Sequence, residues 1–192
     1  MPEKKKTARE KLLACAKEQL LAGSYETLGV RDIVKACGFS IGAFYREFRS
    51  KEELIITVLN EDWADMLRHT DEHFSPEAPA RENLRLLFDG MGSFEQQYGM
   101  SLLGSLVGKK QFAEAERENR GKICAQAERM LRAASERGEF GPGLDFKKAA
   151  CLTVWLGIAA GREPEVSFDE AWDILTLLAQ AERADGAGGN AR

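Results

Sequence analysis

Three residues with metal-binding side chains recur at four-residue intervals: Asp65, His69 and His73. In an α-helix this spacing places them on one face, where carboxylate and imidazole ligands could hold a divalent metal. Asp71 and Glu72 stand beside them, so the favoured interpretation is a hydrated, acidic helix end before the SPEAPA loop. We therefore expect no metal site and no cofactor.

The sequence offers no set of residues that is typical of catalysis. It contains only two histidines, four residues apart, and neither a phosphate-binding glycine loop nor a nucleophile–base–acid combination is visible. We therefore expect that the protein is not an enzyme and has no catalytic residues.

Four cysteines supply the remaining reactive chemistry: Cys15, Cys37, Cys124 and Cys151. They are widely spaced, form no CxxC pair and lack the spacing of a metal finger. In a chain of 192 residues, which does not need disulfides, buried thiols are the favoured interpretation. A redox switch between Cys15 and Cys37 is the alternative, because both would lie in one small helical unit.

The composition is that of an ordinary soluble globular protein, with 44% hydrophobic and 30% charged residues. No apolar run approaches the roughly 20 residues that span a bilayer. The N-terminus is basic, but Glu10 and Glu18 interrupt its apolar stretch and no small-residue cleavage site follows. We therefore expect no secretion signal and a cytoplasmic location.

Charge is distributed unevenly along the chain, whose net charge is −4. Residues 1–55 hold 11 Lys and Arg against 8 Asp and Glu, whereas residues 56–192 hold 16 against 23. The affinity of a protein for a polyanion depends on where its basic groups gather, not on the total. A modestly basic head on an acidic body is therefore compatible with DNA binding.

Apolar residues recur every three or four positions through most of the chain, which is the period of an amphipathic helix. Such runs begin at Leu12, Leu54, Leu84 and Ile123, and no strand-like alternation is visible. Segments rich in glycine or proline, such as SPEAPA and GEFGPGL, separate the runs. The pattern predicts an all-α protein of about nine helices, three short ones before residue 50 and then six longer ones.

The stretch VRDIVKACGFSIGAFYREF predicts two short helices joined by a sharp turn. Gly38 supplies the open backbone of the turn, and Ser40 is suited to cap the second helix. Phe44 and Phe48, four residues apart, would anchor that helix to the core. Two short helices with a glycine-containing turn are typical of the helix-turn-helix unit, whose second helix enters the major groove of DNA.

The segment from Thr7 to Leu54 resembles the DNA-binding domain of TetR-family transcriptional regulators. The matching features are the apolar first helix LLACAKEQLL, Tyr25, the helix-turn-helix stretch and the following SKEEL. The family pattern has a small pair before an apolar–Tyr step, then Phe, then Ser-Lys at the start of the fourth helix. Residues 41–51 follow it without gaps.

This resemblance implies that a set of residues contacts DNA: Arg31, Ser40, Ile41, Gly42, Ala43, Tyr45, Arg46 and Lys51. Tyr45 is similar to the tyrosine that reaches the DNA backbone or a base edge, and Lys51 to the lysine that grips a phosphate. Glu47 departs from the family pattern, and we expect it to pair with Lys51 or to neutralise a neighbouring arginine. The basic arm Lys4–Lys6 could add phosphate contacts, although a solvated tail is the favoured interpretation.

The resemblance also implies the organisation of the whole chain. We expect a helix-turn-helix domain at residues 1–50, with a basic, disordered arm at 1–6, and a helical effector-binding and dimerisation domain at 51–184. A disordered tail would follow at 185–192. The last two long helices would pair with those of a second chain, and the homodimer would bind a palindromic operator in double-stranded DNA, with half-sites about 34–36 Å apart.

An effector site is expected among helices four to seven. The candidates to line it are large apolar residues: Trp63, Met66, Phe88, Met91, Phe94, Tyr98, Met100 and Leu103. Their types suggest an apolar or aromatic small molecule, although such residues at helical spacing are more often plain core.

These expectations combine into one predicted function, a one-component, ligand-responsive repressor that leaves its operator when the effector binds. Two alternatives remain open. One is a helical protein-interaction module with a degenerate helix-turn-helix, and the other is a thiol-based redox-sensing regulator. A steep salt dependence of binding to duplex DNA would separate a DNA-binding protein from an interaction module.

Overall fold

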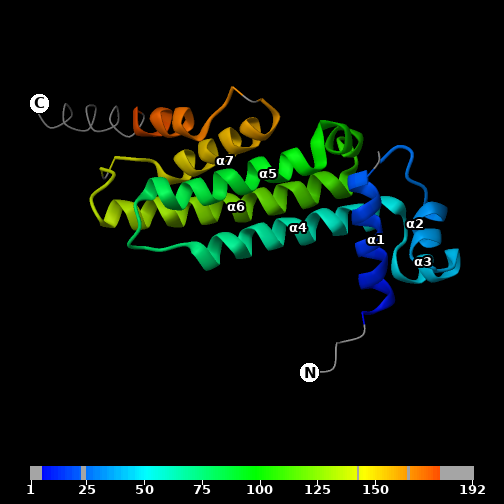
Figure 1. Ribbon diagram of the computed structural model, residues 1–192. Coiled ribbons are helices and arrows are strands. Elements are labelled where there is room, and N and C mark those ends of the chain that lie inside the picture. The colour runs from blue at the N-terminus through cyan, green and yellow to red at the C-terminus, as the bar shows by residue number, and fades with distance from the viewer. Residues whose placement is uncertain (1–5, 23–24, 142, 164, 178–192) are drawn as a thin grey trace, which may run out of the picture. The chain divides into compact units, whose positions relative to one another are not determined.

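The structure, a computed structural model, describes residues 6–22, 25–141, 143–163 and 165–177, apart from the side chains of residues 100 and 101. All regular structure in these ranges is helical. The helices are α1 (Ala8–Ala22), α2 (Val30–Ala36), α3 (Ile41–Glu47), α4 (Lys51–His73), α5 (Ala80–Leu106), α6 (Lys110–Glu136) and α7 (Phe146–Arg162), followed by a helical run over 168–177 (Figure 1).

The prediction of an all-α protein with about nine helices is confirmed within these ranges. Gly99 lies inside α5 with φ of 64° and ψ of 165°, a conformation that is essentially restricted to glycine. It divides α5 into two helices. With α5 counted as two and the run 168–177 as one, the described part of the chain forms nine helices. No helix in the described ranges combines the length and the hydropathy that spanning a bilayer requires.

Two compact units make up the chain, and each is built from two separate segments. The first unit comprises Met1–Trp63 and Gln97–Glu116, and the second comprises Ala64–Gln96 and Arg117–Arg192. The expected domain boundary at residue 50 stays a prediction. Residues 1–5 of the expected arm at 1–6, and the whole expected tail at 185–192, lie outside the described residues.

Helices α1, α2 and α3 pack against one another in the first unit. The predicted apolar face of α1 is buried, and its residue Leu12 is fully enclosed together with Ile33 of α2 and Phe44 of α3. Phe48, which directly follows α3, is only 1% exposed. The two phenylalanines therefore anchor α3 to the core, as their four-residue spacing predicts.

The turn between α2 and α3 has the geometry that its sequence predicts. Gly38 has φ of 70°, and the N–H of Phe39 donates to the carbonyl oxygen of Val34 at 2.8 Å. This is the hydrogen bond that closes a helix in a Schellman motif. On the far side of the turn, Oγ of Ser40 accepts a hydrogen bond from the N–H of Ala43 at 3.1 Å. The predicted N-cap of α3 is thus confirmed.

Glycines bring α5 into close contact with its neighbours in the second unit. A Cβ atom added at Gly90 would lie 2.8 Å from Cγ of Met66 on α4. One added at Gly161, near the end of α7, would lie 2.8 Å from the backbone oxygen of Gly92. Helices α5 and α7 therefore meet backbone to backbone at Gly92 and Gly161.

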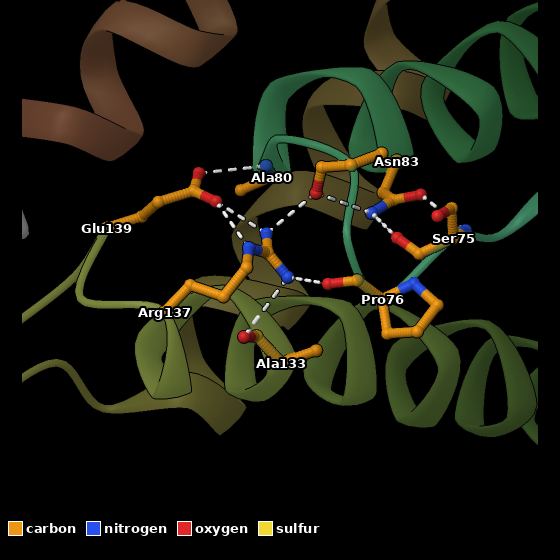
Figure 2. Close-up of polar contacts among 8 residues, drawn as sticks. Ser75, Pro76, Ala80, Asn83, Ala133, Arg137 and Glu139 are labelled. Carbon is orange, nitrogen blue, oxygen red and sulfur yellow. Dashed lines mark hydrogen bonds and ion pairs between the residues drawn. The ribbon is translucent and has the colours of Figure 1, made fainter.

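Arg137, which directly follows α6, holds the loop between α4 and α5 (Figure 2). Its guanidinium donates to the carbonyl oxygens of Pro76 and Ala78, at 2.7 Å for Ala78, and to a carbonyl one turn earlier in α6. It also pairs with Glu139, which accepts a hydrogen bond from the N–H of Ala80 at 2.9 Å. One arginine thus satisfies several backbone acceptors and positions the start of α5.

Asn83, from the first turn of α5, completes the polar cluster of Figure 2. Its side chain is 2% exposed and exchanges hydrogen bonds with both backbone groups of Ser75, at 2.8 and 3.1 Å. Its amide also donates to the carbonyl oxygen of Ala78 at 3.3 Å. The loop backbone is therefore bound from α5 and from the end of α6.

Replacing Arg137 by alanine should lower the free energy of unfolding by about 1–2 kcal/mol, because the loop carbonyls lose charged donors. Urea unfolding monitored by circular dichroism measures this loss. Lys122→Ala is the matched control, since its ion pair with Glu118 is exposed on α6 and such pairs add little to stability. Equal losses in the two variants would contradict the role assigned to Arg137.

Candidate nucleic-acid interface

Helix α3 exposes one edge although it is anchored on the opposite side. Ile41 and Tyr45 lie one turn apart, with 43% and 57% of their surface exposed. The ring of Tyr45 packs edge-on against buried Phe44, with 5.2 Å between ring centroids. Large exposed side chains on a rigidly held short helix are suited to contact a partner.

Two small residues, Gly42 and Ala43, lie next to this edge and differ in their exposure. Gly42 is exposed, and a Cβ atom added there would meet only Oγ of Ser40, at 3.8 Å. The fold therefore does not require glycine at this position, which is compatible with close approach of a partner. Ala43 is buried, so any contact that it makes with a partner involves its backbone.

Lys51, the first residue of α4, is held against the link between α1 and α2. Its ammonium donates to the carbonyl oxygen of Tyr25 at 2.8 Å and lies 4.0 Å from the centroid of the Tyr25 ring. Burial, followed by the nearby carboxylate of Glu52, raises the pKa of Tyr25 to about 12. Tyr25 therefore stays neutral at physiological pH. Its carbonyl oxygen and its ring together keep the Lys51 side chain in a fixed position.

The expected pair between Glu47 and Lys51 is not formed, because Lys51 binds Tyr25 instead. Glu47 ends α3 and Lys51 begins α4, so they do not share a helical face. The contact observed at Glu47 is through its backbone: its carbonyl oxygen accepts a hydrogen bond from Arg9 of α1 at 2.9 Å. The guanidinium of Arg9 also lies 4.3 Å from the centroid of the Phe48 ring.

Arg9 has a structural role that the sequence did not predict. A cation at a helix C-terminus compensates the partial negative charge of the last carbonyl groups. The local sequence does not predict this contact, since Arg9 and Glu47 are separated by 38 positions. It is a tertiary contact that only the packing of α1 on α3 creates.

The basic residues expected to reach phosphates are exposed on the helix-turn-helix. Arg31 on α2 and Arg46 on α3 are both exposed. The acidic residue of α2, Asp32, accepts a hydrogen bond from the N–H of Gly29 at 3.0 Å and so caps the start of that helix. Its charge is thereby engaged at the helix terminus, where a carboxylate is favourable.

The candidate effector residues are divided between the two units. Trp63, Tyr98 and Leu103 are buried in the first unit, where the hydroxyl of Tyr98 donates to Asp62. Burial, and next the neighbouring Asp62, raises the pKa of Tyr98 above its ordinary value. Asp62 also pairs with Lys17 at 2.5 Å, so this part of the first unit is a polar cluster.

The candidates of the second unit take part in core packing. Phe88, Met91 and Phe94 are buried, and Met66 is half-buried. A cavity of about 10 Å³ lies beside Phe88, which is no larger than a single water requires. The side chain of Met100 lies outside the described residues, and the effector site as a whole stays a prediction.

Two of the three candidate metal ligands, His69 and His73, come together with Glu72 at the end of α4. Their ligand atoms lie within 4.8 Å of one another, and all three residues are exposed. Asp65 and Glu72 are instead paired with Arg68 on the same helix, at 2.9 and 3.9 Å.

Comparison of the sequence with known protein families also picks out the helix-turn-helix. Residues 12–58 match the profile of the bacterial regulatory proteins of the tetR family, which confirms the resemblance inferred from the helix-turn-helix. No curated protein matches the chain.

Solved structures share the fold over nearly the whole length. GusR from Salmonella enterica has 20% identity and a TM-score of 0.67, covering 92% of this chain and 94% of that one. The transcriptional regulator FadR from Bacillus subtilis, in complex with stearoyl-CoA, has 19% identity and a TM-score of 0.63, covering 88% and 96%. The reduced form of NemR from E. coli has 20% identity and a TM-score of 0.63, covering 90% and 95%.

Proposed function

Because residues 12–58 match the bacterial regulatory proteins of the tetR family, we propose that the chain is a transcriptional regulator of this family that binds double-stranded DNA and responds to a small molecule. The observation that carries this proposal is the exposed edge of α3, formed by Ile41 and Tyr45 on a helix anchored by Phe44 and Phe48. This edge has the size and rigidity that a recognition helix needs in a major groove.

The base sequence of the DNA would be recognised by the exposed tip of α3. This tip comprises Ser40, Ile41, Gly42 and Tyr45, with the backbone of Ala43 behind it. Phosphates would be bound by Arg31, Arg46 and Lys51. An ammonium carries three protons, and Lys51 donates one of them to Tyr25. The remaining donors would let this lysine bind a phosphate while Tyr25 fixes its direction.

A homodimer formed by α7 and the helix that starts at residue 168 is part of the proposal. Large apolar side chains are exposed on these two helices: Trp155 at 54%, Ile174 at 43% and Leu177 at 63%. A second copy of the chain would cover them, and its two-fold symmetry would require a palindromic operator.

Introducing a charge into this apolar surface should break the dimer. Ile174→Glu would bury a carboxylate without a partner, so we expect monomers at micromolar concentration in analytical ultracentrifugation. Val107→Glu is the matched control, because Val107 is also apolar, 72% exposed and outside the two helices. A dimeric Ile174→Glu protein would place the interface elsewhere.

The effector is proposed to be a small apolar or aromatic molecule. Its binding would release the protein from an operator that the protein represses. FadR, which shares the fold, was solved with stearoyl-CoA, an example of a ligand with a large apolar part. Release would require the effector to bind the DNA-free conformation more tightly than the DNA-bound one.

Selection of bound duplexes from a random-sequence library tests the proposed function. The wild-type protein should enrich one palindrome, Lys51→Ala should lose this enrichment, and Lys122→Ala on the exposed face of α6 should retain it. Affinity for the palindrome should fall steeply with salt, because phosphate contacts release counterions. No enrichment, with salt-independent behaviour, would favour a protein-interaction module.

A second candidate is thiol sensing through Cys15 and Cys37. Both side chains are half-buried. Burial, followed by the hydrogen bond with Cys15, raises the pKa of the Cys37 thiol to about 11. Contact between Cys15 of α1 and Cys37, the residue that follows α2, favours this candidate. It requires that peroxide alters operator affinity in the wild type but not in Cys15→Ser or Cys37→Ser.

A further inference from the structure

Two other thiols face each other across two helices of the second unit. Cys124 lies on α6 and Cys151 on α7, 27 positions later. The Sγ atom of Cys151 donates to the Sγ atom of Cys124 at 3.6 Å, and both residues are half-buried. A disulfide requires about 2.05 Å between the sulfur atoms, so a modest side-chain movement would bring them to bonding distance.

We propose that Cys124 and Cys151 form a redox-active dithiol, which a peroxide closes to an intramolecular disulfide between α6 and α7. Their separation of 27 positions gives no sign in the sequence that these two thiols meet. The inference concerns the second unit and does not depend on DNA binding.

A second contact lies one helical turn from the thiols and joins the same two helices. On α6, Arg120 precedes Cys124 by four residues, and on α7, Trp155 follows Cys151 by four residues. The guanidinium of Arg120 lies 5.1 Å from the centroid of the Trp155 ring. This cation–π contact keeps the two helix faces together, which holds the thiols in register before oxidation.

Two opposing electrostatic effects act on the thiol of Cys124. Burial, followed by the neighbouring Cys151 thiol, raises the pKa of Cys124 to about 11, while the positive charge of Arg120 acts in the opposite direction. The guanidinium of Arg120 favours the thiolate of Cys124 against this larger effect of burial, and we take Cys124 as the attacking sulfur. The raised pKa keeps the thiolate fraction small at neutral pH, so the reaction with peroxide should be slow.

The reaction balances with hydrogen peroxide as the only co-reactant. The Cys124 thiolate attacks one peroxide oxygen and breaks the O–O bond, which yields a sulfenic acid and a hydroxide that takes up a proton to become water. The Cys151 sulfur then attacks the sulfenyl sulfur, and the S–O bond breaks as the S–S bond forms. The departing hydroxide takes the Cys151 proton and leaves as a second water. Two thiols lose two electrons, which reduce one peroxide to two waters.

Cross-link mapping tests the proposal on the full-length wild-type protein. The protein is reduced, freed of reductant, exposed to hydrogen peroxide, alkylated and digested with trypsin. Cleavage after lysine and arginine places Cys124 in residues 123–129 and Cys151 in residues 149–162, while Cys15 and Cys37 fall in two other peptides. The expected product is peptide 123–129 joined to peptide 149–162, in a chain that migrates as a monomer without reductant.

The double variant Cys15→Ser/Cys37→Ser is the matched control and should form the same cross-link. Oxidation should also raise the Tm of this variant by about 5–10 °C, because the disulfide closes a loop in the unfolded chain. The rise should disappear with dithiothreitol and be absent from Cys151→Ser. Recovery of both peptides as separate alkylated or sulfinic species would overturn the proposal. A Cys124–Cys151 bond found only between two chains would overturn it as well.

Discussion

Tyr45→Ala is expected to lower affinity for the operator by about 10- to 100-fold, which corresponds to roughly 1–3 kcal/mol for a contact to DNA. Tyr45 is 57% exposed and touches the core only through the edge of Phe44. Its loss should therefore change the free energy of unfolding by no more than about 0.5 kcal/mol. Fluorescence anisotropy with the selected duplex measures the affinity, and thermal unfolding measures the stability.

Two further variants define what the Tyr45 result means. Tyr45→Phe removes only the hydroxyl, so weakened binding would assign the contact to a hydrogen bond, whereas full binding would assign it to the ring. Leu21→Ala removes an apolar side chain of similar exposure (48%) from α1 and should leave DNA affinity unchanged. Unaltered affinity in Tyr45→Ala would remove the exposed edge of α3 from the interface.

Gly161→Ala is expected to lower the free energy of unfolding by about 2–3 kcal/mol, with a fall in Tm of about 5–10 °C. The new Cβ atom would lie 2.4 Å from Cβ of Glu95 and 2.8 Å from the backbone oxygen of Gly92. Neither atom can move without shifting α5. Glu95 is further fixed by its ion pair with Arg162 at 2.8 Å.

Gly157→Ala, one turn earlier on α7, is the matched control. Its Cβ atom would also meet a close neighbour, at 2.3 Å, but that neighbour is the terminal methyl group of Met91. A flexible methionine can rotate away, and alanine gains up to about 1 kcal/mol over glycine in a helix. We expect a change within about 1 kcal/mol, measured by the same thermal unfolding. Equal losses of stability in the two variants would show that the backbone contact between Gly161 and Gly92 is not the cause of the destabilisation.

Local signals in the sequence predicted the helix-turn-helix well. A left-handed glycine, a serine cap and two phenylalanines four residues apart each act over less than two helical turns. Gly38, Ser40, Phe44 and Phe48 therefore have the roles expected of them. The number of helices could be predicted for the same reason, since apolar periodicity and breaks are local features.

Contacts between distant parts of the chain could not be predicted in this way. Glu47 was expected to pair with Lys51, four positions away, or to neutralise an arginine. Lys51 instead binds Tyr25, 26 positions away, because a helix boundary separates it from Glu47. The thiol pair Cys124–Cys151 and the contact of Gly161 with Gly92 have no local signature. An apolar residue type also fails to distinguish a ligand pocket from plain core, which is why the effector site stays a prediction.

Helix α3 has only seven residues, and a helix of that length does not persist alone in water. It is maintained by side chains that face away from its exposed edge, chiefly Phe44, Phe48 and Arg9. Stability and sequence recognition would therefore reside on opposite sides of one short helix. During evolution the residues at positions 41, 42, 45 and 46 could change, and the protein could acquire a new operator, while its scaffold kept the same folding free energy.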